Sequence, residues 1–209
     1  MQNLTLDPLE VFRSWYERAE RKSFAKTLLT RLYPPAVIHQ PDAMTLATAD
    51  IDGKPSARVV LFKGIEEGGF TFYTNYLSRK GNELEANPRA AAVFHWAFPE
   101  RQVRIEGVIR KLSREQSVAY WMSRPRGSQL GAAASVQSAG MESRQDLIAR
   151  VEELKRKYMD QEVPCPEHWG GYCLTPERIE FWEGRVNRLH ERTLFTKEGT
   201  RWSKRLLAP

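Results

Sequence analysis

Apolar residues follow a helical period in two long segments of the chain. The apolar face of the first segment holds Leu9, Phe12, Tyr16 and Ala19. Asp7 precedes it as an N-cap residue and Pro8 suits the first helical position, so we expect a helix over residues 7–31. The pair Pro34-Pro35 would end it, because proline has no amide hydrogen to donate. The second segment follows the N-cap residue Ser143. Its apolar face holds Leu147, Val151, Leu154 and Tyr158.

From residue 43 onward the apolar positions alternate with a period of two, which is typical of β-strands. The strands predicted in the first half are Met44–Thr48, Ser56–Lys63, Phe70–Asn75, Ala90–Ala97 and Gln102–Lys111. Asp52-Gly53 between the first two strands predicts a hairpin turn, because glycine adopts positive φ without strain, and Glu67-Gly68-Gly69 separates the second strand from the third. The strands predicted near the C-terminus are Tyr172–Leu174, Ile179–Trp182, Arg188–Thr196 and Arg201–Leu206, the last two turning at Glu198-Gly199.

Two shorter helices are predicted between these strands. Ser78 caps one that ends at Asn87-Pro88, and Ser113 with Gln116 forms a capping box for another. Residues 126–142 show little periodicity, so a linker and an ordered loop both stay open. Many hairpin-connected strands without a strand–helix rhythm argue against a parallel Rossmann sheet. The sequence predicts a mainly antiparallel β fold with helices, a β-barrel.

The composition is that of an ordinary globular protein, with 41% apolar and 28% charged residues among 209. This length favours one compact domain, with a second small one possible. No apolar run approaches the roughly 20 residues of a membrane helix, and the N-terminus has no secretory pattern, so we expect a cytoplasmic protein. Cys165 and Cys173 are expected as free thiols, and we expect no metal site. The net charge of +6 suggests anionic ligands or nucleic acid.

Cations gather at two places that could bind phosphate. Arg58 and Lys63 flank an apolar strand, and Arg79-Lys80 stand at a predicted helix start, where free amide groups favour anions. A solvated helix end is an equally good interpretation of Arg79-Lys80 alone. The second place combines the side chains of Tyr120, Arg124 and Ser128 near Pro125. There the alternative is an arginine favoured by the dipole at a helix C-terminus.

A third cationic group lies near the C-terminus. If residues 188–196 form a strand, Arg188, His190 and Arg192 share one face. Such neighbours repel one another unless an anion lies between them. The alternative is a solvated edge strand whose charges deter pairing.

These segments together resemble the pyridoxine (pyridoxamine) 5′-phosphate oxidase family. The matching segments include Arg58-Val-Val-Leu-Phe-Lys63, Phe72-Tyr-Thr-Asn75, Ser78-Arg-Lys80, Glu100-Arg-Gln-Val103, Ser123-Arg-Pro-Arg-Gly-Ser-Gln129, Val136-Gln-Ser138, Trp169-Gly-Gly171, Phe181-Trp182, Arg188-Leu-His190 with Arg192, and Arg205-Leu-Leu-Ala-Pro209. Each motif is weak alone, and their order and spacing are specific. The resemblance implies an FMN-binding split barrel that works as a homodimer. It divides the chain into an N-terminal helical segment and possible lid (1–42) and an oxidase domain (43–209).

The resemblance also implies site residues. For FMN these are Arg58, Val59, Val60, Leu61, Lys63, Tyr73, Thr74, Arg79, Lys80, Gln102, Gln137, Ser138, Trp182 and Arg192. For the substrate they are Lys63, Tyr120, Arg124, Ser128, Arg188 and His190, with catalytic roles for Arg188 and His190. The implied reaction passes a hydride from C4′ of pyridoxine or pyridoxamine 5′-phosphate to flavin N5, giving pyridoxal 5′-phosphate. Molecular oxygen then reoxidises the flavin and yields hydrogen peroxide.

The sequence departs from the resemblance at Phe62, at Trp121-Met122 and in the long segment Lys22 to Gln40. Three other functions stay open. A flavin oxidase of phenazine biosynthesis would not need the phosphate-suited Lys63, Arg124 and Ser128. A split-barrel protein that binds a cofactor without oxidase activity would show no turnover. A nucleic-acid binder, suggested by the pI of 9.4, would need a basic stripe with exposed aromatics rather than discrete clusters.

Overall fold

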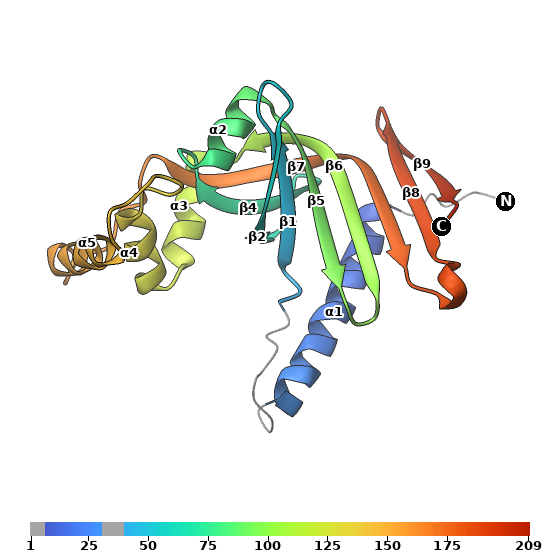
Figure 1. Ribbon diagram of the computed structural model, residues 1–209, viewed down its shortest axis with the longest axis horizontal. Helices are drawn as coiled ribbons and strands as arrows, with labels where there is room; N and C mark the ends of the chain where they lie inside the picture. Colours follow the sequence, from blue (N-terminus) through green and yellow to red (C-terminus); the bar gives the residue numbers. More distant parts are fainter. Residues whose placement is uncertain (1–6, 31–39) are drawn as a thin grey trace.

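One curled antiparallel sheet organises the protein. The structure, a computed structural model, describes residues 7–30 and 40–209. The strands are β1 (Ala43–Ala49), β2 (Pro55–Leu61), β3 (Gly64–Glu66), β4 (Gly69–Asn75), β5 (Arg89–Trp96), β6 (Arg101–Lys111), β7 (Trp169–Glu183), β8 (Glu191–Glu198) and β9 (Arg201–Leu207). Their order is β2-β1-β5-β6-β7-β4-β3, and β8 and β9 continue from β7. The half-barrel that results confirms the predicted fold class (Figure 1).

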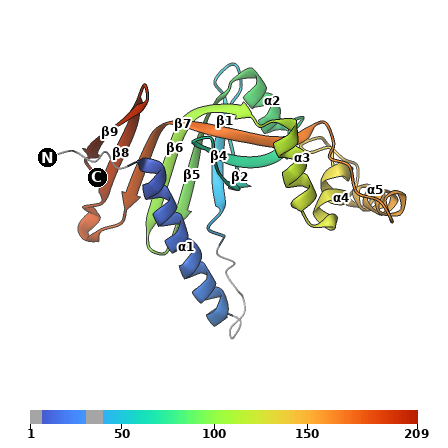
Figure 2. The same cartoon turned by 180° about the vertical axis from the view of Figure 1, so that it is seen from behind.

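Helices cover this sheet unevenly. They are α1 (Pro8–Thr30), α2 (Arg79–Ala86), α3 (Arg114–Ser123), α4 (Arg126–Ala134) and α5 (Arg144–Lys157), with a short 3-10 turn over Val186–Arg188. α3, α4 and α5 lie at one end of the molecule, and the β8–β9 hairpin lies at the other (Figures 1 and 2). The predicted N-caps Ser78, Ser113 and Ser143 all accept the expected backbone amide, and Ser113 with Gln116 closes a capping box. These helix starts are therefore confirmed.

An aromatic core fills the inside of the curled sheet. From Arg101 to Arg110 of β6, buried and half-buried residues alternate, as the period of two requires. α1 contributes Phe12, whose ring centroid lies 4.8 Å from Phe70 and 5.0 Å from Phe94, both edge to face. The predicted apolar face of α1 is thus confirmed at Phe12 and Ala19, which are buried. The division at residue 42 stays a prediction, and Pro34-Pro35 lies outside the described residues.

Residues 126–142 are more ordered than the sequence suggested. The first nine of them form α4, although they include two glycines. Leu130 and Ala134 are buried on this helix, and Leu130 belongs to a second apolar cluster with Trp121, Val163 and Trp169. Tertiary packing of this kind outweighs weak helix propensity. The expectation of a loop or linker was therefore wrong for residues 126–134.

The two strands expected at Tyr172–Leu174 and Ile179–Trp182 are one continuous strand, β7. The register of the β6–β7 pair shifts between Glu106 and Gly107, where β7 has one extra residue, Glu177, beside Pro176, so the proline is accommodated at a β-bulge and the pairing continues. Gly107 is required there, because a Cβ at this position would lie 2.0 Å from the carbonyl oxygen of Thr175. β7 therefore runs unbroken from the α3–α5 end of the molecule to β8.

The strand predicted from Arg188 begins three residues later. Arg188 lies in the 3-10 turn with φ of 60°, and Asn187 before it also has positive φ. β8 starts at Glu191, so Arg188 and His190 are outside it. The shared strand face predicted for Arg188, His190 and Arg192 was wrong, because left-handed backbone breaks the alternation.

The helices in the described part of the chain include none with the length and apolarity to cross a bilayer. Across the same residues, His, Cys, Asp and Glu form no group of three suited to a metal ion. Cys165 and Cys173 are free thiols, as expected.

Candidate functional site

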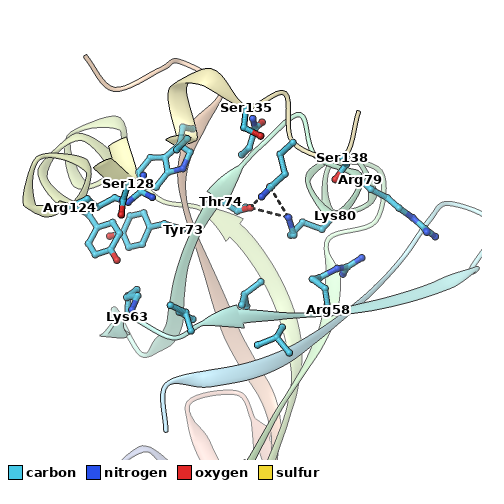
Figure 3. A pocket seen from close by; sticks show the side chains of 18 of the residues that line it. Arg58, Lys63, Tyr73, Thr74, Arg79, Lys80, Arg124, Ser128, Ser135 and Ser138 are labelled. Carbon is cyan, nitrogen blue, oxygen red and sulfur yellow. Dashed lines mark hydrogen bonds between the residues drawn. The ribbon is translucent and has the colours of Figure 1, made fainter. Parts of the chain in front are cut away.

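One large cavity collects most of the predicted site residues. Its volume is about 850 Å³, within the range of small-molecule sites. Its walls come from β2, β4, the start of α2, the α3–α4 break and the loop after α4. The predicted residues that line it are Arg58, Val59, Val60, Leu61, Lys63, Tyr73, Thr74, Arg79, Lys80, Tyr120, Arg124, Ser128, Gln137 and Ser138. Its cations form two groups on opposite sides of the cavity, as Figure 3 shows.

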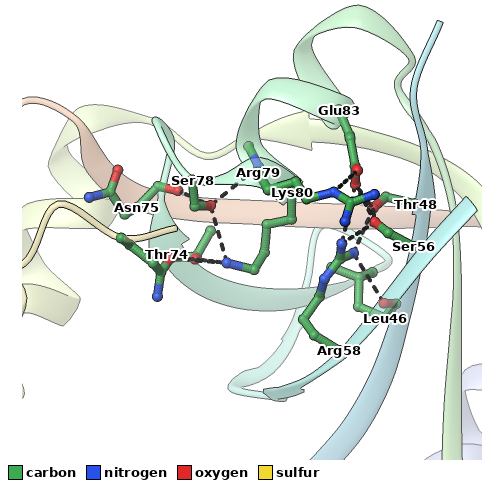
Figure 4. A network of polar contacts seen from close by, with 12 residues as sticks. Leu46, Thr48, Ser56, Arg58, Thr74, Asn75, Ser78, Arg79, Lys80 and Glu83 are labelled. Atoms are coloured by element: carbon green, nitrogen blue, oxygen red, sulfur yellow. Dashed lines mark hydrogen bonds and ion pairs between the residues drawn. The ribbon is translucent and has the colours of Figure 1, made fainter. Parts of the chain in front are cut away.

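The first group holds Arg79 and Lys80, at the start of α2, and Arg58, on β2. Glu83, one turn into this helix, joins two of them: its Oε2 lies 3.2 Å from Arg58 Nη2, and its Oε1 accepts from Arg79 Nε at 2.8 Å (Figure 4). Thr48 Oγ1 also donates to the carboxylate, at 2.5 Å. Burial alone would raise the pKa of Glu83, but hydrogen bonds from Ser56, Thr48, Arg79 and Arg58 outweigh it and lower the pKa to about 2. Glu83 is therefore a permanent anion that orients both arginines.

Lys80 differs from its two neighbours because it has no carboxylate partner in the described residues. Its Nζ donates to Thr74 Oγ1 at 3.1 Å, to Ser78 Oγ at 3.1 Å and to Gln137 Oε1 at 3.0 Å. Burial, followed by repulsion from Arg58, lowers the pKa of Lys80 to about 8. A buried ammonium held by neutral oxygens is suited to an anionic ligand.

The second group holds Lys63, Arg124 and Ser128, with the phenol of Tyr120 beside them. Lys63 Nζ lies 3.0 Å from Asp42 Oδ2. Arg124 has a buried Nη1 with no hydrogen-bond partner, and burial lowers the pKa of its guanidinium. Ser128 lies in the first turn of α4, close to the break at Pro125. This end of the cavity thus offers an uncommitted donor to a second anionic group.

Five predicted residues lie outside the cavity: Gln102, Trp182, Arg188, His190 and Arg192. They form a group of their own. Gln102 pairs with Trp182 and Trp182 pairs with Arg192, so these three form a row across β6, β7 and β8. The His190 ring lies 4.6 Å from Trp182, and Arg192 Nε donates to Glu180 at 2.8 Å. In one chain the predicted site is therefore two separate groups.

Some cavity residues were not assigned roles from the sequence. Glu83 could have been found, because it stands four residues after Arg79 on a predicted helix, the spacing of a helical ion pair. Trp169 was seen only as part of a motif, and it lines the cavity next to Arg124. Ser56 and Ser135 carried no signal that separates them from other surface serines.

Comparison with known proteins places this chain in a family. Residues 35–158 match the family model described as pyridoxamine 5′-phosphate oxidase, and residues 169–209 match the pyridoxine 5′-phosphate oxidase C-terminal dimerisation region. A pyridoxine/pyridoxamine 5′-phosphate oxidase of Rubrobacter xylanophilus is 51% identical over 97% of this chain and 87% of its own length. One of Salinibacter ruber is 48% identical over 99% of this chain and 91% of its own.

Two solved structures are similar to this one. PhzG from Burkholderia lata 383, in complex with tetrahydrophenazine-1-carboxylic acid, superimposes with a TM-score of 0.86 at 29% identity, covering 99% of this chain and 95% of that one. A pyridoxamine 5′-phosphate oxidase-related, FMN-binding protein from Nostoc punctiforme PCC 73102 shares the fold, with a TM-score of 0.70 at 16% identity over 93% of this chain and 97% of that one. By its sequence matches over nearly its whole length, this chain belongs to the pyridoxamine 5′-phosphate oxidase family.

Proposed function

We propose that the protein is an FMN-dependent oxidase that converts pyridoxine 5′-phosphate and pyridoxamine 5′-phosphate to pyridoxal 5′-phosphate. The observation that carries this proposal is a single cavity with a cationic group at each side, in a member of this family. A flavin mononucleotide and a phosphorylated pyridine together bring two phosphates. Lys80 is buried, and Arg124 is half-buried with a buried Nη1. Neither has a carboxylate partner in the described residues, which fits that pair of ligands.

The group at the start of α2 is the proposed site of the flavin phosphate. Arg58, Arg79 and Lys80 supply positive charge, and Glu83 keeps the two arginines oriented. The remaining proposed flavin contacts within this cavity are Val59, Val60, Leu61, Lys63, Tyr73, Thr74, Gln137 and Ser138. Gln102, Trp182 and Arg192 complete the flavin site from a second subunit, since they lie apart from the cavity in one chain.

Lys63, Tyr120, Arg124 and Ser128 are the proposed substrate-phosphate residues. Arg188 and His190 are proposed to come from the second subunit and to hold the pyridine ring. Arginine suits this role because a planar guanidinium can stack on a ring and still donate hydrogen bonds. Bound FMN supplies the two-electron acceptor, and molecular oxygen regenerates it with release of hydrogen peroxide.

The active form is a homodimer in this proposal. The C-terminal 41 residues, 169–209, match a region described as a dimerisation region. They include Trp182, Arg188, His190 and Arg192, which are four of the five predicted site residues outside the cavity. We also propose a cytoplasmic location, supported by the two free thiols.

The relation to PhzG supports a second candidate, an oxidase whose substrate carries a carboxylate instead of a phosphate. Arg124 could bind either anion. The higher identity to the Rubrobacter and Salinibacter oxidases favours the phosphorylated substrate.

An absorption experiment tests the proposal directly. Purified protein should show the visible bands of bound flavin, and anaerobic pyridoxine 5′-phosphate should bleach them. Admitting oxygen should restore the bands and release hydrogen peroxide. A colourless protein, or bands that pyridoxine 5′-phosphate leaves unchanged, would reject the proposed function.

A further inference from the structure

The guanidinium of Arg124 is bracketed by two indole rings. Its Cζ lies 4.7 Å from the ring centroid of Trp169 and 5.2 Å from that of Trp121. In the described residues it forms no ion pair, and its Nη1 is buried without a hydrogen-bond partner. Arg58 and Arg79, across the cavity, share the carboxylate of Glu83 instead. The two sides of the cavity therefore hold their arginines by different means.

This difference has a consequence for ligand binding. A carboxylate beside an arginine neutralises it and competes with an incoming anion. An indole face attracts a cation through its quadrupole and carries no net charge. Arg124 is thus held in place while its full charge and one donor nitrogen stay available.

Trp169 also fixes the neighbours of Arg124. It stacks on Tyr73 at 5.7 Å with an interplanar angle of 14°, and it lies parallel to Tyr120 at 6.2 Å and 4°. Tyr73 and Tyr120 stack on each other at 3.8 Å. Trp121 meets Trp169 edge to face at 4.8 Å. The buried indole of Trp169 therefore contacts both Tyr120 and Arg124, which are two of the proposed substrate-phosphate residues.

Trp121 is itself fixed on both sides. Its indole Nε1 donates to the carbonyl oxygen of Val163 at 2.8 Å. Its own carbonyl oxygen accepts from Gln129 Nε2 at 2.8 Å, and Gln129 is buried on α4. These bonds hold the α3–α4 break, where Arg124 lies, against the loop before β7.

We propose that Trp169 and Trp121 are positioning residues for the substrate. They form an aromatic clamp that orients Arg124 toward the substrate phosphate without neutralising it. This inference rests on the proposed function only for the identity of the phosphorylated ligand.

Trp169→Met in the FMN-loaded enzyme tests the clamp, because methionine fills irregular space but has no ring face. The variant should raise KM for pyridoxine 5′-phosphate, and the Kd of inorganic phosphate measured by calorimetry, by roughly 5- to 30-fold. Its kcat should stay near wild type, since loss of uniform binding raises KM alone. Trp169→Phe keeps a ring face and should recover most of the phosphate affinity. Trp202→Met, which removes a lysine–indole contact on β9 outside the cavity, should change neither constant.

Unchanged KM and phosphate affinity in Trp169→Met would overturn the clamp. So would a Trp169→Phe variant as impaired as Trp169→Met. If Trp169→Met does not fold, Arg124→Lys takes its place: lysine keeps the charge but cannot stack a planar group on an indole face, so phosphate affinity should fall similarly. Normal affinity in Arg124→Lys would overturn the clamp as well. A wild-type protein that binds phosphate without oxidising pyridoxine 5′-phosphate would reject the proposed function. The phosphate Kd values of the variants would then still decide whether the clamp exists.

Discussion

The lowered pKa of Lys80 makes both the stability of the apoprotein and its affinity for FMN depend on pH. The pKa of its ammonium is lowered from 10.5 to about 8, so the folded apoprotein binds fewer protons than the unfolded chain between these values. The free energy of unfolding of the apoprotein therefore gains from Lys80 as pH rises through this window. A phosphate dianion at Lys80 reverses the effect, because it favours the charged ammonium and raises its pKa.

FMN affinity should consequently fall as pH rises above about 8, by up to 10-fold per pH unit, because binding takes up one proton. Fluorescence titration of apoprotein with FMN measures it. Lys80→Gln should flatten this dependence. Riboflavin, which lacks the phosphate, serves as control and should bind with the same affinity across the range. A pH-independent FMN affinity in the wild type would show that the phosphate lies away from Lys80.

Arg79 tests the same phosphate position by a different property. Its side chain is 58% exposed, and its Nε is already bonded to Glu83, so only part of the guanidinium is available. Arg79→Ala should weaken FMN by about 10-fold, the low end of a charge-assisted hydrogen bond. Riboflavin affinity should not change. Arg89→Ala, which removes an exposed arginine paired with Glu177, is the matched control. Equal FMN affinity in Arg79→Ala and Arg89→Ala would show that Arg79 does not bind the flavin phosphate.

At the scale of elements, α3 and α5 have the same kind of cap but different surroundings. Ser113 Oγ accepts from Gln116 N at 3.1 Å, and α3 buries Trp121 beneath it. Ser143 Oγ accepts from Asp146 N at 3.2 Å, and α5 buries no residue. Loss of either cap removes about 1 kcal/mol from its helix.

Ser113→Ala should therefore lower the melting temperature by about 2–4 °C, because α3 unfolds with the core. Ser143→Ala should leave the main transition in place and reduce helical circular dichroism before it, because α5 can fray alone. Both variants need the same protein and FMN concentrations, since ligand binding shifts the transition. A larger melting shift for Ser143→Ala than for Ser113→Ala would show that α5 is part of the cooperative core.

Local signals explain which elements the sequence could predict. A serine cap fixes the backbone of the few residues at a helix start, and a glycine at positive φ fixes a turn. Such glycines are Gly53, Gly68 and Gly199, and the caps and turns at these positions were predicted correctly. α4 was missed because its stability comes from Leu130 packing on residues far along the chain. The turn at Arg188 was missed because an arginine at positive φ leaves no mark in the alternation pattern.

For the site, too, the sequence predicted local features but not contacts between distant segments. Its cations were visible in the sequence as phosphate-binding candidates, because charge and helix starts are local. Among the described residues Arg124 has two indoles beside it and no carboxylate. This arrangement depends on α3, α4 and β7 meeting, which no spacing in the sequence encodes. The family resemblance alone predicted Gln102, Trp182 and Arg192 as site residues. The structure shows that these three are neighbours across β6, β7 and β8.

At the scale of the whole molecule, the two groups of site residues lie apart in one chain, which suggests that each active site takes residues from two subunits. The cavity group lies among β2, β4, α2 and α3. Arg188 belongs to the segment between β7 and β8, and this segment lies toward the opposite end of the sheet (Figure 1). We consider an arrangement in which each active site joins the cavity of one subunit to the Arg188 group of its partner. A chain mutated in the cavity and a chain mutated at Arg188 should then restore one intact site when they form a mixed dimer.

Arg124→Ala and Arg188→Ala homodimers should each be nearly inactive, because every site contains one damaged group. When the two variants are unfolded together and refolded with FMN, half of the dimers are mixed, and each mixed dimer has one site with both groups intact. Activity should return to roughly a quarter of the wild-type value. Each variant refolded alone is the control, and differently tagged chains report how many mixed dimers form. Mixed dimers without activity would place both groups of each site in one subunit, and the shared-site arrangement would have to be abandoned.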